Sequence, residues 1–171
     1  DIAGGPARYM LEVLQDYPDP KLRAVVRDRD EDGLEEGRKL ASQQDESRIT
    51  YQSGDAFDSS EVAGLGPLDV AVVSGLYELF PDNGPVAQSL AGLAEAIKPG
   101  GYLIYTNQPY HPTLELIAET LQHAGGQRWV MRCRSTAEMD ALVREAGFEK
   151  CRSLIDRHGI FSVSLARRLP T

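Results

Sequence analysis

One stretch near the middle of the chain limits its fold more than any other. Residues 68–74 have the sequence Leu-Asp-Val-Ala-Val-Val-Ser, which is nearly all apolar, and Gly75 follows them. A short apolar run of this kind is typical of a strand that is buried on both faces. Because a parallel sheet needs a covering layer on each side, the stretch predicts an α/β fold with helices on the crossover connections.

Helix and strand patterns alternate along the rest of the chain, as such a fold requires. The expected helices cover residues 6–16, 31–43, 86–97, 114–121 and 135–147, and the expected strands cover 22–26, 49–53, 68–74, 102–106, 148–156 and 160–167, with a short extended segment at 128–133. The last two strands are close enough in sequence to form a hairpin. We therefore predict a Rossmann-like, doubly wound, mostly parallel sheet with a C-terminal antiparallel hairpin, built as a single domain from residues 1–171.

Composition argues against several kinds of partner. Asp and Glu number 26 against 18 Lys and Arg, for a formal net charge of -8, whereas nucleic acid and anionic membranes reward clustered positive charge. Cys133 and Cys151 lack metal-ligand spacing, so we expect a reduced, cytoplasmic setting. No signal peptide or membrane-length apolar run is visible. We expect no nucleic acid and no membrane partner, and the sequence leaves the oligomeric state open.

The first residues of the chain suit a loop that passes closely under a bound nucleoside. Asp1 is followed by small residues as far as Ala7, and a helical pattern begins directly after them. Small side chains let the backbone approach a ligand, and glycine adopts positive φ at little cost. Such a loop normally follows a strand, so we expect a first strand upstream of Asp1 and interpret the chain as a trimmed piece.

Several landmarks resemble, in order and spacing, those of the class I S-adenosylmethionine-dependent methyltransferases. They are the loop Asp1–Ala7, the acid Asp28, Gly54-Asp55-Ala56, the run Asp69 to Glu78, the turn Lys98-Pro99-Gly100-Gly101, and Ala146-Gly147-Phe148 before the hairpin. The resemblance covers nearly the whole chain. One departure is that the family's loop pattern, acid-x-Gly-x-Gly-x-Gly, has Ala3, Gly5 and Ala7 at its glycine positions.

The resemblance implies S-adenosylmethionine as the cofactor and a small molecule as the methyl acceptor. Asp28 stands at a strand end, about twenty residues past the loop, where an acid can accept hydrogen bonds from ribose hydroxyls. A solvated turn acid is the plainer interpretation, and we assign it to Asp30. The other implied contacts are Asp1, Ala3 and Gly5 with the methionine part, Asp55, Ala56 and Phe57 with the adenine, and Ser74, Gly75 and Leu76 with the reacting methyl group.

The sequence does not assign a catalytic residue. A general base is needed only when the accepting atom must lose its proton early. The rim residues are Tyr77, Glu78, Tyr110, His111 and His158, of which Tyr77 and His111 are kept as weak candidates. Arg132 and Arg134 would hold an acidic substrate by paired hydrogen bonds or lie on a solvated face. Ser74 stands where metal-dependent relatives would carry an acid, so we expect no metal.

Two alternatives stay open. A nicotinamide (NAD(P)-dependent) oxidoreductase shares the small-residue loop and the ribose acid, but the Gly-Asp-Ala turn at 54–56 and the closing hairpin favour a methyltransferase. A non-catalytic nucleoside-binding or partner-binding module would also explain the two alanines of the loop.

Overall fold

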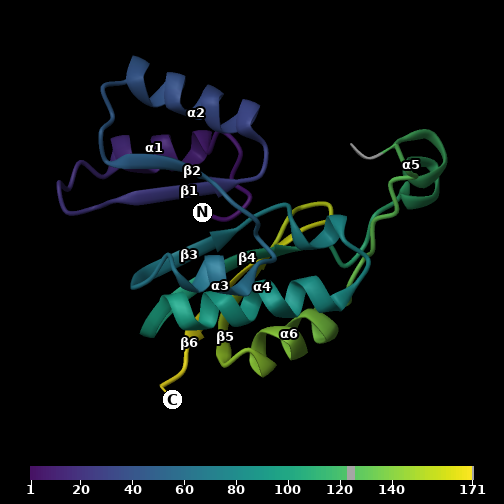
Figure 1. Cartoon of the computed structure of the whole chain (residues 1–171). Coiled ribbons are helices and arrows are strands. Elements are labelled where there is room, and N and C mark those ends of the chain that lie inside the picture. The colour runs from purple at the N-terminus through teal and green to yellow at the C-terminus, as the bar shows by residue number, and fades with distance from the viewer. Residues whose placement is uncertain (123–125, 171) are drawn as a thin grey trace.

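Strands and helices alternate along the chain in a computed structural model, which describes residues 1–122 and 126–170 (Figure 1). In chain order the elements are α1 (Arg8–Asp16), β1 (Ala24–Asp28), α2 (Glu31–Gln43), β2 (Ile49–Ser53), α3 (Ser59–Ala63), β3 (Leu68–Val73), a 3-10 turn (Tyr77–Leu79), α4 (Asn83–Ala96), β4 (Ile97–Asn107), α5 (Leu114–Thr120), α6 (Thr136–Glu145), β5 (Phe148–Ile155) and β6 (Ser162–Arg168). The predicted α/β class is confirmed.

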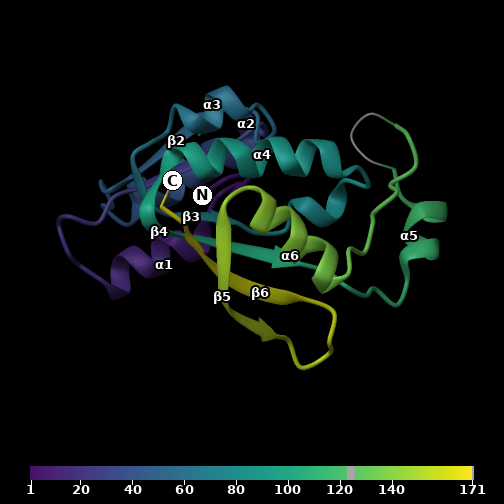
Figure 2. The same cartoon turned by 90° about the horizontal axis from the view of Figure 1, so that it is seen from below.

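The strands form a mixed sheet in two groups. β1 pairs in parallel with β2, and the second group has the order β3-β4-β6-β5. β3 and β4 are parallel, while β6 runs antiparallel to both β4 and β5. The predicted C-terminal hairpin is therefore present, and Figure 2 shows it as the yellow-green edge of the sheet.

A single residue joins the two groups of strands. Ile2 forms a parallel bridge with Arg27 of β1 on one side and with Val73 of β3 on the other. Its N–H donates to the Val72 carbonyl over 2.9 Å, and the Gly4 N–H donates to the Arg27 carbonyl over 3.3 Å. All these contacts lie at the carboxyl ends of β1 and β3, so the start of the chain is fixed at that edge of the sheet.

Two apolar cores correspond to the two groups of strands. α1 and α2 cover β1 and β2, whereas α3, α4 and α6 lie against the larger group, and α5 stands apart at the end of long connections (Figure 1). The larger core includes Ile2, Val62, Val73, Tyr77, Val86, Leu90, Leu93, Leu103, Tyr105, Met139, Val143 and Phe148, and the smaller one includes Leu11, Leu14, Val26 and Leu34.

No helix in the described part of the chain is long and apolar enough to cross a bilayer.

The turn predicted at residues 98–101 lies inside a strand instead. β4 begins at Ile97, which pairs with Leu68, and the register then shifts so that Val70 pairs with Tyr102. The residues between the two pairs form a bulge in which Gly100 has a φ of 82°. The sequence indicated the break correctly, but backbone pairing on both sides of it was not visible in the sequence.

Other features also differ from the prediction. β1 begins at Ala24 rather than residue 22, and the short helix α3 was not predicted. Its N-cap is Asp58, whose carboxylate accepts the N–H groups of Ser60 and Glu61, a local signal that the sequence does contain. The predicted burial of β3 on both faces is also only partly correct. Val70 is 48% exposed, and its pairing partner Tyr102 on the inner strand β4 is 37% exposed, so this face of the sheet is incompletely covered here.

Two glycines of α4 give a matched test of the packing between α3 and α4. A Cβ at Gly92 would lie 2.6 Å from the Ser59 carbonyl oxygen, whereas a Cβ at Gly84 would meet no atom within 4 Å. We expect Gly92→Ala to lower the free energy of unfolding by about 1–3 kcal/mol through overpacking. Gly84→Ala should leave it unchanged or raise it by up to about 1 kcal/mol. Equal urea midpoints for the two variants would contradict the close contact.

Candidate functional site

The carboxyl ends of β1, β2, β3 and β4 lie at one edge of the sheet, because the four strands are mutually parallel through their own pairing and the bridges of Ile2. Every predicted cofactor-binding residue lies at this edge or directly after one of these strands. They are Asp1, Ala3 and Gly5 in the first loop, Asp28 at the end of β1, Asp55, Ala56 and Phe57 after β2, and Ser74 and Gly75 after β3.

The first loop is tied to the acid at the end of β1. The Gly5 N–H donates to Oδ2 of Asp28 over 2.8 Å, and the Asp30 N–H donates to Oδ1 over 2.9 Å. Asp28 thus fixes both the loop and the turn into α2. Both of its oxygens retain a lone pair, since a carboxylate oxygen can accept more than one hydrogen bond.

The two alanines of this loop have positive φ, a backbone conformation that glycine adopts more easily. Ala3 has a φ of 56° and Ala7 a φ of 49°. A residue with a Cβ in this left-handed region costs about 1–2 kcal/mol. Strain of this size is retained only where surrounding contacts enforce it, and it gathers at functional sites. The Ala7 N–H donates to the Gly4 carbonyl over 2.9 Å, which is one such contact.

Asp1 points an unpaired oxygen into the protein at the same loop. Its Oδ2 accepts the hydroxyl of Tyr9, while its Oδ1 is buried without a hydrogen-bond partner. Burial raises the pKa of Tyr9 to about 12, so this phenol keeps its proton and remains the donor. The free Oδ1 is suited to a cationic or N–H group of a ligand.

Two aromatic rings meet where β2 and β3 end. Oδ1 of Asp55 accepts the Phe57 N–H over 2.9 Å, which forms a tight turn. The Phe57 ring then packs edge-on against Phe80, with 4.6 Å between the centroids. Nη1 of Arg29 lies 3.9 Å from Oδ2 of Asp55. Phe80 extends the predicted adenine wall to the loop after β3, and the sequence analysis did not identify it.

A polar chain links the ends of β3 and β4. Gly75 has a φ of 73°, and its N–H donates to Oγ1 of Thr106 over 2.8 Å. The same Oγ1 lies 3.5 Å from Oε1 of Glu78, whose side chain is buried. Oε2 of Glu78 has no hydrogen-bond partner among the described residues. Thr106 was predicted only as the end of a strand, so its contacts depend on tertiary structure.

For Arg134 both interpretations from the sequence are wrong, because the residue neither lies on a solvated face nor keeps its guanidinium free for a substrate. Its guanidinium is 1% exposed and donates to the carbonyls of Tyr77, Phe80 and Asp82 over 2.6, 2.7 and 2.9 Å, and to Oδ1 of Asn83 over 2.7 Å. These acceptors all belong to the loop that joins β3 to α4. Arg134 is therefore the residue that holds this loop in place.

Arg132 holds the same loop from its exposed side. Nη1 donates to the Pro81 carbonyl over 3.0 Å and Nη2 to Oε1 of Glu138 over 2.5 Å. Its backbone N–H donates to the Glu78 carbonyl over 3.2 Å. Neither arginine keeps its guanidinium free for an acidic substrate.

The two weak catalytic candidates do not meet at the site. The Tyr77 hydroxyl is bonded to Oγ of Ser89 over 3.0 Å in the core, and burial raises the pKa of this phenol. His111 accepts the Thr113 N–H over 3.2 Å in a surface turn. Packing and turn formation account for both side chains.

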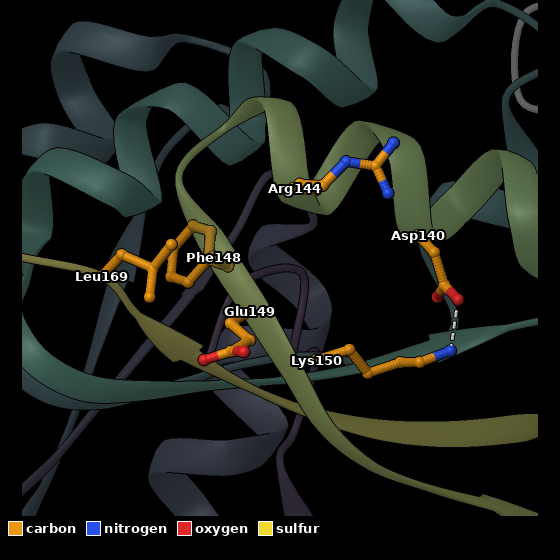
Figure 3. Close-up of a pocket in the computed structure, with 6 residues that line it drawn as sticks. All are labelled: Asp140, Arg144, Phe148, Glu149, Lys150 and Leu169. Atoms are coloured by element: carbon orange, nitrogen blue, oxygen red, sulfur yellow. Dashed lines mark hydrogen bonds and ion pairs between the residues drawn. The ribbon is translucent and has the colours of Figure 1, made fainter.

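A hollow lies at the opposite edge of the sheet, and Figure 3 shows the residues that line it. It has a volume of about 350 Å³ and is lined by Asp140, Arg144, Phe148, Glu149, Lys150 and Leu169. Phe148 pairs with Arg168, and the adjacent Arg167 pairs with Tyr102, where the pairing of β4 with β6 begins. This hollow is therefore remote from the carboxyl ends of the parallel strands. Its Lys150 and Asp140 form an ion pair with each other.

Among the residues that the structure describes, no group of three or more His, Cys, Asp or Glu side chains is arranged to hold a metal ion.

Comparison with known proteins gives a consistent family. A family model described as "Putative methyltransferase" matches residues 1–168. A curated relative, "Uncharacterized protein YnbC" of Escherichia coli (strain K12), is 51% identical over 171 residues, which cover 98% of this chain and 29% of the relative. The chain thus spans less than a third of that relative's length.

Solved structures share the fold. An O-methyltransferase family protein from Burkholderia thailandensis is 22% identical, with a TM-score of 0.77 over 99% of this chain and 50% of that one. Mitomycin 7-O-methyltransferase MmcR is 27% identical, with a TM-score of 0.76 over 98% of this chain and 48% of that one.

Replacing each of the two arginines tests which one holds the loop after β3. Arg134→Met removes the donor of four acceptors, of which the Tyr77 carbonyl is buried and the other three are partly buried. A hydrogen bond of a charged group contributes about 1.5–3 kcal/mol, so we expect the free energy of unfolding to fall by about 3 kcal/mol or more. Arg132→Met removes an ion pair whose arginine side chain is 42% exposed, and the loss should stay near 1 kcal/mol. Chemical denaturation measures both, and equal losses would refute the assignment to Arg134.

Proposed function

This chain belongs to the methyltransferase family that matches its residues 1–168, and from that premise we propose that it binds S-adenosylmethionine and transfers the methyl group to a small-molecule acceptor. The observation that carries the proposal is the loop tied to Asp28 by the Gly5 N–H at the carboxyl ends of four parallel strands. A Rossmann-like, doubly wound arrangement of residues 1–171 as one domain is part of the same proposal.

The residues at this edge fit the chemical groups of the cofactor. The buried, unpaired Oδ1 of Asp1 suits the ammonium of the methionine part. Asp28 has lone pairs left for the ribose hydroxyls, and Phe57 and Phe80 offer ring surface to the adenine. A Cβ at Gly5 or at Gly75 would meet no atom within 4 Å, so both positions leave open space beside the backbone.

The cofactor supplies a methyl group on a sulfonium, which is already reactive toward a nucleophile. The residues of this chain then have to bind, align and exclude water. The first loop and Asp28 fix the orientation from one side. The other side, next to Ser74 and Gly75, is closed by the loop that Arg134 holds and by Leu76, which is 8% exposed. The acceptor would approach from this second side.

Charge favours this cofactor over the nicotinamide alternative. Asp1, Asp28 and Asp55 line the edge, and the nearby arginines face acids of the protein, with Arg8 paired to Glu36 and Arg29 beside Asp55. A dinucleotide would bring an anionic pyrophosphate to this edge, whereas S-adenosylmethionine brings a sulfonium and an ammonium. Calorimetry with each ligand separates the two proposals, and binding of neither would favour a partner-binding module.

Asp28→Ala tests the ribose contact directly. Loss of a charged hydrogen bond costs about 1.5–3 kcal/mol, so we expect the dissociation constant for S-adenosylmethionine to rise by about 10- to 150-fold in calorimetry. Asp30→Ala is the control, because Asp30 is exposed and its side chain forms no cap hydrogen bond. A folded Asp28→Ala protein with the affinity of the control would contradict the assignment.

A further inference from the structure

We propose that Glu78 contacts the reacting group of the acceptor and takes its proton, and that this group is a neutral hydroxyl. The inference rests on the methyltransferase function proposed above and goes beyond it by naming the base and the class of acceptor. It is carried by the position of the Glu78 carboxylate, by the missing partner of its Oε2, and by the way in which the neighbouring cation is occupied.

The position of Glu78 is set by the ends of two adjacent parallel strands. The residue lies in the 3-10 turn that follows β3, and its Oε1 is 3.5 Å from Oγ1 of Thr106 near the end of β4. Oγ1 of Thr106 accepts the N–H of Gly75. Two contacts therefore connect the carboxylate to Gly75, which is exposed and lies where we propose that the methyl group is transferred.

Oε2 of Glu78 is a buried acceptor with no donor among the described residues. Buried carboxylate oxygens are nearly always hydrogen-bonded, and an exception calls for an explanation. The oxygen is covered by protein, so an acceptor must displace covering side chains to reach it. The hydroxyl of a bound acceptor would supply the missing donor.

The nearest cation does not neutralise Glu78. Arg134 lowers the pKa of the carboxyl by its charge, but four of its five N–H donors bond three carbonyls and Asn83. No ion pair of Glu78 occurs in the part of the chain that the structure describes. Arg132 presents only its backbone N–H, which donates to the Glu78 carbonyl. Because Arg134 bonds mainly to other acceptors and forms no ion pair with Glu78, the Glu78 carboxyl remains free to exchange a proton.

The protonation equilibrium suits a base. Burial raises the pKa of Glu78, against the smaller opposing effects of the residue's own backbone N–H, the Thr106 contact and the Arg134 charge. A base works best when its pKa lies near the working pH. Since the native carboxyl holds its proton where the unfolded chain has lost it, the free energy of unfolding falls as pH rises from the unfolded pKa through the native pKa.

The chemistry balances with a hydroxyl acceptor. The O–H bond of the acceptor breaks, its proton goes to Oε2 of Glu78, and the electron pair on oxygen forms the bond to the methyl carbon. The pair that joined the methyl carbon to sulfur stays on sulfur, which becomes a neutral thioether. A carboxylate acceptor would instead meet the like charge of Glu78, and a neutral amine would not need to lose its proton early.

The test compares Glu78→Gln with Glu95→Gln, a matched change on the exposed face of α4. Calorimetry with S-adenosylmethionine comes first, and both variants should bind within about twofold of the native protein. Methyl transfer is then measured with phenol, catechol, benzyl alcohol, thiophenol, aniline and benzoate. We expect the native protein to methylate a hydroxyl compound at a rate that rises between low and neutral pH. Glu78→Gln should be slower by about 10²- to 10⁴-fold and should lack this rise. Glu95→Gln should behave as the native protein.

A second measurement does not depend on activity. The melting temperature of the native protein should fall as pH rises through the Glu78 pKa, and this part of the fall should be absent from Glu78→Gln but present in Glu95→Gln. At pH 8 Glu78→Gln should therefore melt above the native protein. If it melts below, the carboxylate supports the loop, and the inference is overturned.

The outcomes separate the two proposals. If the native protein does not bind S-adenosylmethionine, the proposed function itself fails. If it binds but methylates no hydroxyl compound, or if Glu78→Gln keeps its rate and pH profile, the role of Glu78 is overturned while the cofactor site stands.

Discussion

The backbone of Ile2 is paired with strands on both of its sides, and the geometry of the candidate site depends on these contacts. Bridges to Arg27 and Val73 join β1 and β3, which do not pair with each other. They also fix the direction in which the chain leaves the sheet, toward the carboxyl ends of both strands. The residues that follow Ile2 can therefore reach Asp28, and the Gly5 N–H binds its carboxylate.

The sequence predicted those parts of the site that depend on local chemistry and strand order. Alternating patterns place the ends of parallel strands at one edge, so Asp28, Asp55 and Gly75 were expected together and lie there. The loop was harder to predict, because Ala3 and Ala7 replace residues that adopt positive φ freely. Both alanines nevertheless have positive φ. The contacts around the loop determine its conformation, and the residue type determines only how much strain it carries.

The contacts that the sequence could not predict all join segments that lie far apart in the chain. Arg134 follows the loop of residues 76–83 by some fifty positions, and its four acceptors are mostly backbone carbonyls, which leave no mark on the side-chain pattern. Phe80 and Thr106 likewise gain their partners only when the strands are assembled. The bulge in β4 is a similar case, since glycines mark a break but do not say whether pairing resumes beside it.

Some buried polar atoms at this edge of the sheet have no hydrogen-bond partner. Four of the five N–H donors of Arg134 bond acceptors of the protein. Oδ1 of Asp1 and Oε2 of Glu78 are buried acceptors without donors, and Nε of Arg27 is a buried donor without an acceptor. A folded protein retains unpaired carboxylate oxygens at a cost, because each has lost its hydration. A ligand with donors or positive charge at two separate points would remove that cost at both. S-adenosylmethionine bears an ammonium on its methionine part, and a hydroxyl acceptor brings a donor to the methyl group, so together they match the two unpaired oxygens. A dinucleotide would instead bring the negative charge of its pyrophosphate to an edge lined by carboxylates, and this difference supports our preference for the methyltransferase proposal.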